Sequence, residues 1–413
     1  MPDSQSKSMS PAASTQVALA PSLRPHAIRS MAVEYDLMLA CSSVSWSPEL
    51  EARVQKLLSL PVNWPVLWEQ SDQHGLLPVI QQRLQSFRSL IPNSTWTEIH
   101  SRITAHVRRA LRLTQLLHTV NDALAQAGIC TLAYKGPVLA ERLYGDVAMR
   151  QFFDLDLFLR AAEVARATDV LKEIGLVAHT EFRPAEWREL LSSGYELTFD
   201  GFGNRNLVEV KWRVLPRFYA IDLATEQFFE RAQTRPVSGK ALLTLSDEDL
   251  FLVLCSHAGK HAWNKLSWIS DIAGLVSCAN LDWQWLGERA ATLGIQRIVG
   301  INLYLAKELL NAEIPATIKG IFAEDPQIRV LGEQVARNIL SNQGLDPESV
   351  AYFRFILTTR ERLRDRIRFI CRLVFTPSQS EWSMIRVPAP LFPLYYMIRL
   401  FRLIGRALGN QVA

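Results

Sequence analysis

Residues 153–159 place the strongest constraint on the fold, because apolar and acidic side chains alternate along them with a period of two. That period is typical of a β-strand, whose successive side chains point to opposite faces. We expect Asp154 and Asp156 to lie side by side on one face. The other face should enter a core with Phe153, Leu155, Leu157 and Leu159. Neighbouring carboxylates repel each other unless a cation lies between them, and Mg²⁺ commonly takes one or two carboxylates with water and substrate phosphate.

A second alternating stretch, residues 206–214, offers a third carboxylate. Its apolar face is expected to hold Val208, Val210, Trp212 and Val214, and its other face Leu207, Glu209, Lys211 and Arg213. The second face is either solvated, with weak ion pairs of about 0–1 kcal/mol each, or it adds a carboxylate beside bases that bind phosphate. Because Asp154 and Asp156 precede it in the same predicted sheet, we favour the functional interpretation for Glu209.

The chain has 413 residues, enough for two or three domains at roughly 150 residues each. The patterns predict an α+β fold, in which a small mixed-sheet core is flanked by N-terminal and C-terminal helical regions. The expected regions are a disordered leader at 1–30, an N-terminal helical region at 31–127, the α/β core at 128–244, a helical domain at 245–350 and a basic amphipathic helical tail at 351–413.

The tail carries the excess of positive charge. The whole chain has a net charge of +4, whereas residues 351–413 contain eleven Arg and three acidic residues. One predicted helix places Leu363, Ile367, Ile370 and Val374 beside Arg360, Arg364, Arg368 and Arg372, and a second carries Arg399, Arg402 and Arg406 on one face. Either these are solvated faces of packing helices, or they make peripheral contact with an anionic membrane or an acidic partner.

The cysteines and the apolar runs indicate in which cellular compartment the protein is expected. The five cysteines are scattered and lack CxxC spacing, which argues against a disulfide framework or a thiolate zinc site and favours a cytoplasmic location. No signal peptide is expected, because the first 20 residues contain no apolar core. The longest apolar run near the C-terminus, residues 387–398, contains three prolines. It is shorter than the roughly 20 residues that a transmembrane span needs.

Two histidines lie four residues apart in the predicted helix that follows Ser246. His257 and His261 would share one face of this helix, a spacing that could bind zinc. No glutamate follows His257 as in the HExxH motif, and no third ligand is evident, although Asp271 is available. We favour packing or polar contacts with the neighbouring site for this pair.

Several of these residues together resemble the signature of a known family. Lys135-Gly136, Tyr144-Gly145-Asp146, Arg150 and Asp154-Leu155-Asp156-Leu157 are similar, in this order, to an uncharacterised bacterial nucleotidyltransferase family of the DNA polymerase β-like superfamily. The later segment Glu209-Val210-Lys211-Trp212, the helical residues 257–271 and residues 391–402 also resemble it. The resemblance covers most of the chain from about residue 34 onward.

The resemblance implies a metal-dependent transfer of a nucleoside monophosphate from a nucleoside triphosphate (NTP), such as ATP, to an acceptor. Mg²⁺ or Mn²⁺ would be held by two carboxylates, and a third would complete the site or activate the acceptor; here these are Asp154, Asp156 and Glu209. The expected NTP contacts are Lys135, Gly136, Arg150, Lys211 and Arg213. A small molecule, a peptide, a protein and a tRNA end all stay open as acceptors.

Two positions depart from the superfamily pattern. Gly136-Pro137 stands where a Gly-Ser turn usually contacts phosphate, and proline has no backbone N–H. Lys211 stands where the family usually has His. Its ammonium can pair with Glu209 and compete with the metal, or it can reach the triphosphate. These departures leave open a catalytically silent nucleotide-binding or scaffold protein of the same fold.

Overall fold

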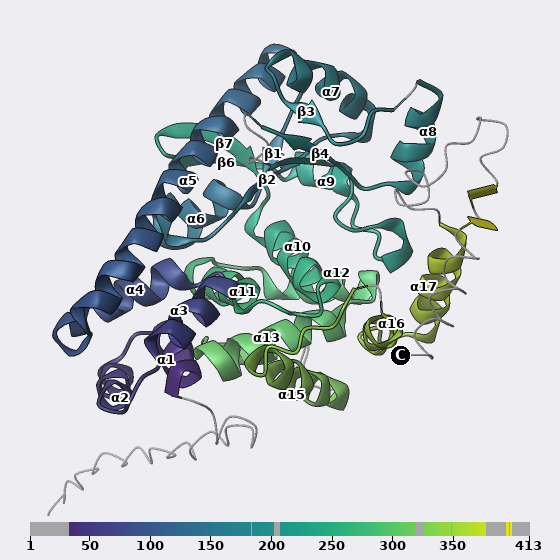
Figure 1. Ribbon diagram of the computed structural model, residues 1–413. Coiled ribbons are helices and arrows are strands. Elements are labelled where there is room, and N and C mark those ends of the chain that lie inside the picture. Colours follow the sequence, from purple (N-terminus) through teal and green to yellow (C-terminus); the bar gives the residue numbers. More distant parts are fainter. Residues whose placement is uncertain are drawn as a thin grey trace, which may run out of the picture.

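A computed structural model describes residues 33–182, 184–201, 207–318, 325–347, 349–376, 394–395 and 397–398. The expected leader at 1–30 and the arginines of the second tail segment lie outside the described residues. The architecture is α+β, as predicted: helices surround a small mixed sheet, which lies in the upper part of the molecule (Figure 1).

The sheet has five strands in the order β1-β2-β5-β4-β3. Their bounds are Leu132–Ala133 for β1, Asp154–Phe158 for β2, Val177–Ala178 for β3, Glu196–Asp200 for β4 and Leu207–Lys211 for β5. The central strands β2 and β5 are parallel, and the other neighbours are antiparallel. The register of β2 and β5 sets Asp156 opposite Glu209. The two alternating stretches of the sequence therefore lie next to each other.

One face of the sheet packs on two helices. Leu155, Leu157, Val208 and Val210 are buried in a cluster with residues of α5 (Asn93–Gln126) and α7 (Val164–Glu173). Figure 1 shows α5 running as a long diagonal beside the sheet. The prediction for Phe153 is wrong. The strand begins one residue later, and the Phe153 ring is 51% exposed and lies under the guanidinium of Arg109.

A second hydrophobic cluster joins the helices that precede the sheet to those that follow it. The preceding helices are α1 (Val33–Cys41), α2 (Pro48–Leu58), α3 (Trp64–Gln73), α4 (Leu77–Leu84) and the 3₁₀ helix η2 (Gln85–Leu90). The following ones are α10 (Asp247–Lys260), α11 (Leu266–Cys278), α12 (Trp283–Leu293), α13 (Gln296–Leu310) and α15 (Pro326–Leu340). Ser246 caps α10 as its sequence indicates, because its hydroxyl accepts the backbone N–H of Asp249.

The remaining elements connect these layers. They are α6 (Gly136–Tyr144), α8 (Pro184–Ser193), α9 (Thr225–Glu230), the 3₁₀ helices η3 (Val147–Met149), η4 (Ala161–Glu163), η5 (Arg217–Tyr219) and η6 (Ala316–Ile318), and a hairpin of β6 (Gln233–Val237) and β7 (Lys240–Thr244). The sequence patterns did not predict this hairpin. Its turn residues Ser238 and Gly239 both have positive φ, as a two-residue hairpin turn requires.

The described part of the tail forms α16 (Val350–Thr358) and α17 (Leu363–Phe375). Phe369 of α17 is fully buried, whereas Leu363 and Ile367 are 71% and 53% exposed. Arg360 does not belong to the predicted arginine row. It precedes the helix and is buried, with its guanidinium against the carbonyls of Ala220 and Leu293. Within the described residues, no helix is both long and apolar enough to cross a membrane.

Candidate active site

The two aspartates lie on β2 beside the N-terminus of α6. Gly136 begins α6 with a φ of +53°, a left-handed conformation that glycine adopts readily. A Cβ at this position would lie 3.3 Å from the carbonyl oxygen of Asp154. Glycine therefore lets the first turn of α6 approach the strand that carries both carboxylates.

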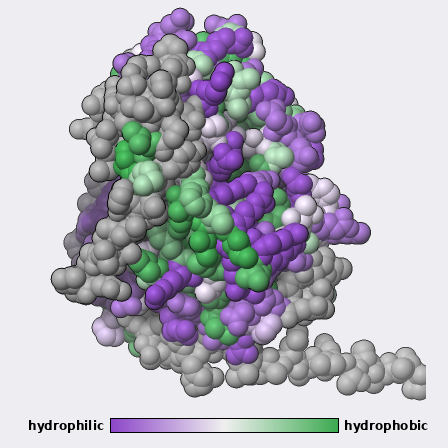
Figure 2. Space-filling view, turned by 90° about the vertical axis from the view of Figure 1, so that its right-hand side faces the viewer, coloured by the Kyte–Doolittle hydropathy of each residue, from purple (hydrophilic) through white to green (hydrophobic). Residues whose placement is uncertain are grey.

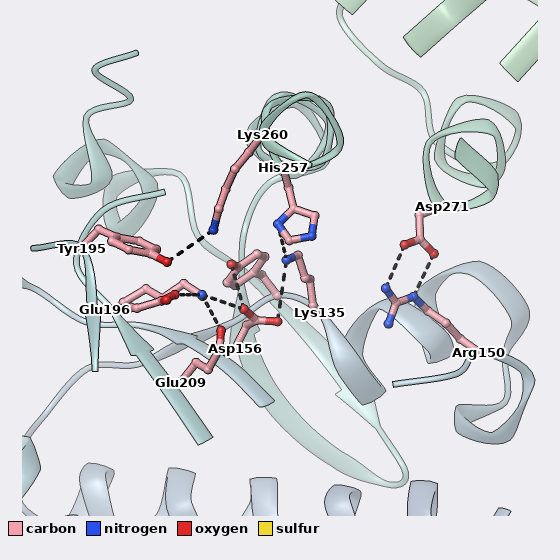
Figure 3. A network of polar contacts seen from close by, with 11 residues as sticks. Lys135, Arg150, Asp156, Tyr195, Glu196, Glu209, His257, Lys260 and Asp271 are labelled. Atoms are coloured by element: carbon pink, nitrogen blue, oxygen red, sulfur yellow. Dashed lines mark hydrogen bonds and ion pairs between the residues drawn. The ribbon is translucent and has the colours of Figure 1, made fainter. Parts of the chain in front are cut away.

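Asp156 is held by two lysines and a tyrosine (Figure 3). It is 4% exposed. The Tyr134 hydroxyl donates to Oδ1 over 3.3 Å, and Lys211 Nζ lies 3.3 Å from the same oxygen. Lys135 Nζ lies 3.8 Å from Oδ2. Burial alone would raise the pKa of Asp156, but Lys135 and Lys211 outweigh it and lower the pKa. Asp156 is therefore an ionised carboxylate at neutral pH.

Lys211 is the centre of the network of charged side chains around Asp156. Its ammonium contacts Asp156, Glu196 of the neighbouring strand β4, and Glu209, whose Oε2 lies 2.5 Å away. Burial lowers the pKa of Lys211, but Asp156 and Glu196 outweigh this effect and hold the pKa well above its ordinary value. Of the two roles that the sequence left open, the structure shows the ion pair with Glu209.

A third lysine enters from helix α10. Lys260 Nζ lies 3.4 Å from the Tyr195 hydroxyl and 4.9 Å from the centre of that ring. Burial, together with the nearby Lys211 and Lys135 and in spite of Glu196, lowers the pKa of Lys260 to about 8. The Lys260 ammonium thus has less negative charge around it than Lys211 has, and an arriving anion would stabilise it.

The remaining two carboxylates carry raised pKa values. Burial and the neighbouring Asp156 raise the pKa of Asp154, and burial raises the pKa of Glu209 in spite of Lys211. A cation between Asp154 and Asp156 would offset their repulsion. Across the described residues, no three His, Cys, Asp or Glu side chains form a group that could hold a metal ion. The residues fit an ion held by two aspartates and substrate phosphate, whereas Oε2 of Glu209 is paired with Lys211.

Two predicted NTP contacts lie apart from this network. Arg150 forms a buried bidentate pair with Asp271 of α11, with both N–O distances at 2.8 Å, and Figure 3 shows the pair to one side of the lysines. Arg213 was expected beside Glu209 and Lys211. Strand β5 ends at Lys211, and the charges that act on Arg213 are those of Arg217, Asp222 and Arg372.

The histidine pair contacts the network through one ring. Lys135 Nζ lies 3.1 Å from His257 Nδ1. Burial and Lys135 lower the pKa of His257 well below its ordinary value, so the imidazole is neutral and accepts at Nδ1. The rings of His257 and His261 both contact Trp268. His257 thus orients Lys135.

Four members of the network were not among the site residues predicted from the sequence: Tyr134, Tyr195, Glu196 and Lys260. Glu196 lies opposite Lys211 across the antiparallel pair β4 and β5. An acid opposite a base on neighbouring strands is a recognisable signal once the register is known. Tyr134 directly precedes Lys135, and its burial beside Asp156 follows from the packing of Phe158 on its ring.

Sequence comparison identifies the family. A family described as uncharacterised nucleotidyltransferase matches residues 61–311, which is more than half of the chain. The chain belongs to this nucleotidyltransferase family. The matched residues include all four carboxylates and all three lysines of the network. Nucleotidyl transfer is therefore the activity class of the family.

Two solved structures show a distant likeness to the chain. One is the solution structure of the antibiotic-resistance factor ANT(2'')-Ia, at 15% identity over 46% of this chain and 88% of that chain, with a TM-score of 0.28. The other is an antigenic nucleotidyltransferase-like protein from Paracoccidioides brasiliensis, at 16% identity over 51% of this chain and 97% of that chain, with a TM-score of 0.30. No curated protein matches.

Proposed function

We propose that the protein transfers a nucleoside monophosphate from an NTP to an acceptor, with Mg²⁺ or Mn²⁺ held by Asp154 and Asp156. The observation that carries this proposal is the pair of aspartates on β2, which lies against the N-terminus of α6 through the close approach of Gly136. When bound, the ion would supply positive charge next to the triphosphate oxygens. The other roles fall to side chains of the chain itself.

Lys135 and Lys260 are the proposed triphosphate contacts. Burial lowers the pKa of both ammonium groups, so negative charge on the substrate would stabilise them. Lys211 already contacts three carboxylates and is proposed as a positioning residue. Charge-assisted hydrogen bonds from the two lysines would stabilise the charge that develops on the leaving pyrophosphate.

Glu209 is the proposed general base for the acceptor. Its carboxylate lies on β5 opposite Asp156, and burial raises its pKa toward the range useful for proton transfer. This role replaces that of a metal ligand, because Lys211 lies against Oε2. The acceptor is any molecule with a hydroxyl or similar nucleophile that reaches Glu209.

Incubation of the purified protein with α-labelled NTPs, Mg²⁺ and cell extract tests the proposal. We expect label to appear on an acceptor and to depend on the metal. The double variant Asp154→Asn, Asp156→Asn should transfer no label, whereas Arg329→Gln, at an exposed ion pair on α15, should match the parent. Equal transfer by the double variant and the parent would refute the assignment.

The second candidate, a silent nucleotide-binding or scaffold protein, draws support from Lys211, whose ammonium occupies the space between three carboxylates. It predicts that a non-hydrolysable NTP binds in calorimetry but that no acceptor gains label. Covalent transfer to any acceptor would exclude this candidate.

A further inference from the structure

A cavity of about 340 Å³ opens beyond the carboxyl ends of the parallel strands β2 and β5. Its walls come from Ala161, which follows β2, and from residues 212–226, which follow β5. Part of the lining is apolar, through Trp212, Leu215 and Ile221, and part is charged, through Arg213, Arg217 and Asp222. None of these residues belongs to the network around Asp156.

Arg213 is the unusual member of this lining. It is half-buried, and its guanidinium makes no ion pair and no hydrogen bond with any residue of the described ranges. Burial lowers its pKa, and Arg217 lowers it further. A guanidinium has five N–H donors, and its burial is favourable only where they find acceptors. A bound anion beside Arg213 would stabilise the charged guanidinium against both burial and the repulsion from Arg217.

The surroundings of Arg213 hold more positive than negative charge. Asp222 is its nearby carboxylate, and helix α17 already engages it: Arg368 donates to Oδ2 and Arg372 to Oδ1, each over 2.8 Å. Glu226 at the cavity wall pairs with Arg160. Three guanidinium groups, those of Arg213, Arg368 and Arg372, thus act on the single carboxylate of Asp222, and Arg217 adds a further positive charge near Arg213.

We propose that this cavity binds the phosphate group of a small molecule and that Arg213 is the principal contact. A phosphate monoester carries close to two negative charges at neutral pH, which matches the charge excess, and it accepts paired hydrogen bonds from guanidinium. The apolar lining would accommodate the organic part of the ester. The site is separate from the aspartate pair, and the proposal does not rest on nucleotidyl transfer.

Two sources can supply such a group, a soluble phosphate ester or a lipid headgroup. The lipid source fits α17, which supplies Arg368 and Arg372 and exposes Leu363, Ile367 and Ile370 on its outer face. Figure 2 views the side of the molecule that carries α17, where hydrophobic and hydrophilic surface lie next to each other. Both sources share the chemistry of a phosphate bound by arginine.

Calorimetric titration with inorganic phosphate and with glycerol phosphate tests the soluble source. Arg213→Gln should weaken binding about tenfold or more, because it removes a charge-assisted hydrogen bond to the phosphate. The matched control Arg329→Gln removes an exposed arginine on α15 and should leave binding unchanged. Asp222→Asn should strengthen binding, because it releases Arg368 and Arg372 for the ligand.

Flotation with phosphatidylcholine vesicles, with and without phosphatidic acid, tests the lipid source. Binding that requires phosphatidic acid and is lost in Arg213→Gln supports the site with a lipid ligand. The proposal is refuted if Arg213→Gln keeps the affinity of the parent in both assays. It is also refuted if the parent binds neither the soluble phosphates nor the vesicles. The double variant Asp154→Asn, Asp156→Asn should keep the Arg213-dependent phosphate binding, so a failure of the proposed nucleotidyl transfer is distinguishable from a failure of this site.

Discussion

The substitution Lys211→Met removes the ammonium that three carboxylates share. Lys211 is 6% exposed, and its Nζ lies 3.3 Å from Asp156 and 2.5 Å from Glu209. At an effective dielectric constant of about 20, an ion pair at 3.3 Å is worth about 5 kcal/mol, and the desolvation of the ammonium offsets part of this. Loss of one partner of a buried ionic group typically costs about 3–5 kcal/mol. We expect a loss of that size in the free energy of unfolding at pH 8.

The stability lost in Lys211→Met should depend on pH in a definite direction. In the parent, Lys211 helps to lower the pKa of Asp156 and Glu196, so their stabilising effect is present above the ordinary carboxyl range and is lost on acidification. Without Lys211 the pKa values of Asp156 and Glu196 in the folded state rise. Ionisation of these carboxylates then opposes folding, so the variant loses stability as the pH increases. The difference between the parent and the variant should therefore be largest at pH 8 and smaller at pH 5.

Urea unfolding at both pH values measures this difference. The matched control is Lys172→Met, which removes an exposed lysine paired with one carboxylate of Glu181 and should cost less than about 1 kcal/mol. If Lys211→Met unfolds at the same urea concentration as the control, or if its defect grows toward pH 5, the account of Lys211 as the centre of the network is wrong.

Three further substitutions test other parts of the site. Gly136→Ala should lose more stability than Gly128→Ala, because both glycines have positive φ but only the first has backbone within reach of a new Cβ; the strain common to both is about 1–2 kcal/mol, and thermal unfolding compares them. NTP affinity, measured by calorimetry, should fall as the pH rises through about 8, where Lys260 loses its proton, and Lys260→Met should remove that slope. Arg150→Gln should destabilise the protein by about 3–5 kcal/mol, because it leaves Asp271 buried without its partner, and a double-mutant cycle with Asp271→Asn should recover part of the loss.

The strand pair that carries the candidate site could be predicted from the sequence. Alternation with a period of two is a local property, and it gave both strands and the shared face of Asp156 and Glu209. The ends of the strands could not be predicted in this way. Phe153 lies before β2 and Arg213 after β5. The alternating pattern in the sequence therefore extends beyond the residues that form the strands.

The partners of Lys211 depend on contacts that no local pattern contains. Glu196 reaches it through the antiparallel register of β4 and β5, and Lys260 acts on the network from helix α10. The hairpin of β6 and β7 was missed for another reason. Pro236 lies within its first strand, and a proline argues against a strand except at a sheet edge.

The assignment of the ion to Asp154 and Asp156, rather than to a set completed by Glu209, can be measured directly. Mn²⁺ binding in the presence of a non-hydrolysable NTP, followed by electron paramagnetic resonance, reports the ligands without turnover. Asp154→Asn should weaken Mn²⁺ binding by well over about tenfold, the scale on which even indirect partners of a metal act. Glu209→Gln, at the carboxylate paired with Lys211, should change it by less than about threefold. Equal losses in the two variants would make Glu209 a ligand, and no loss in Asp154→Asn would contradict a metal site on this strand.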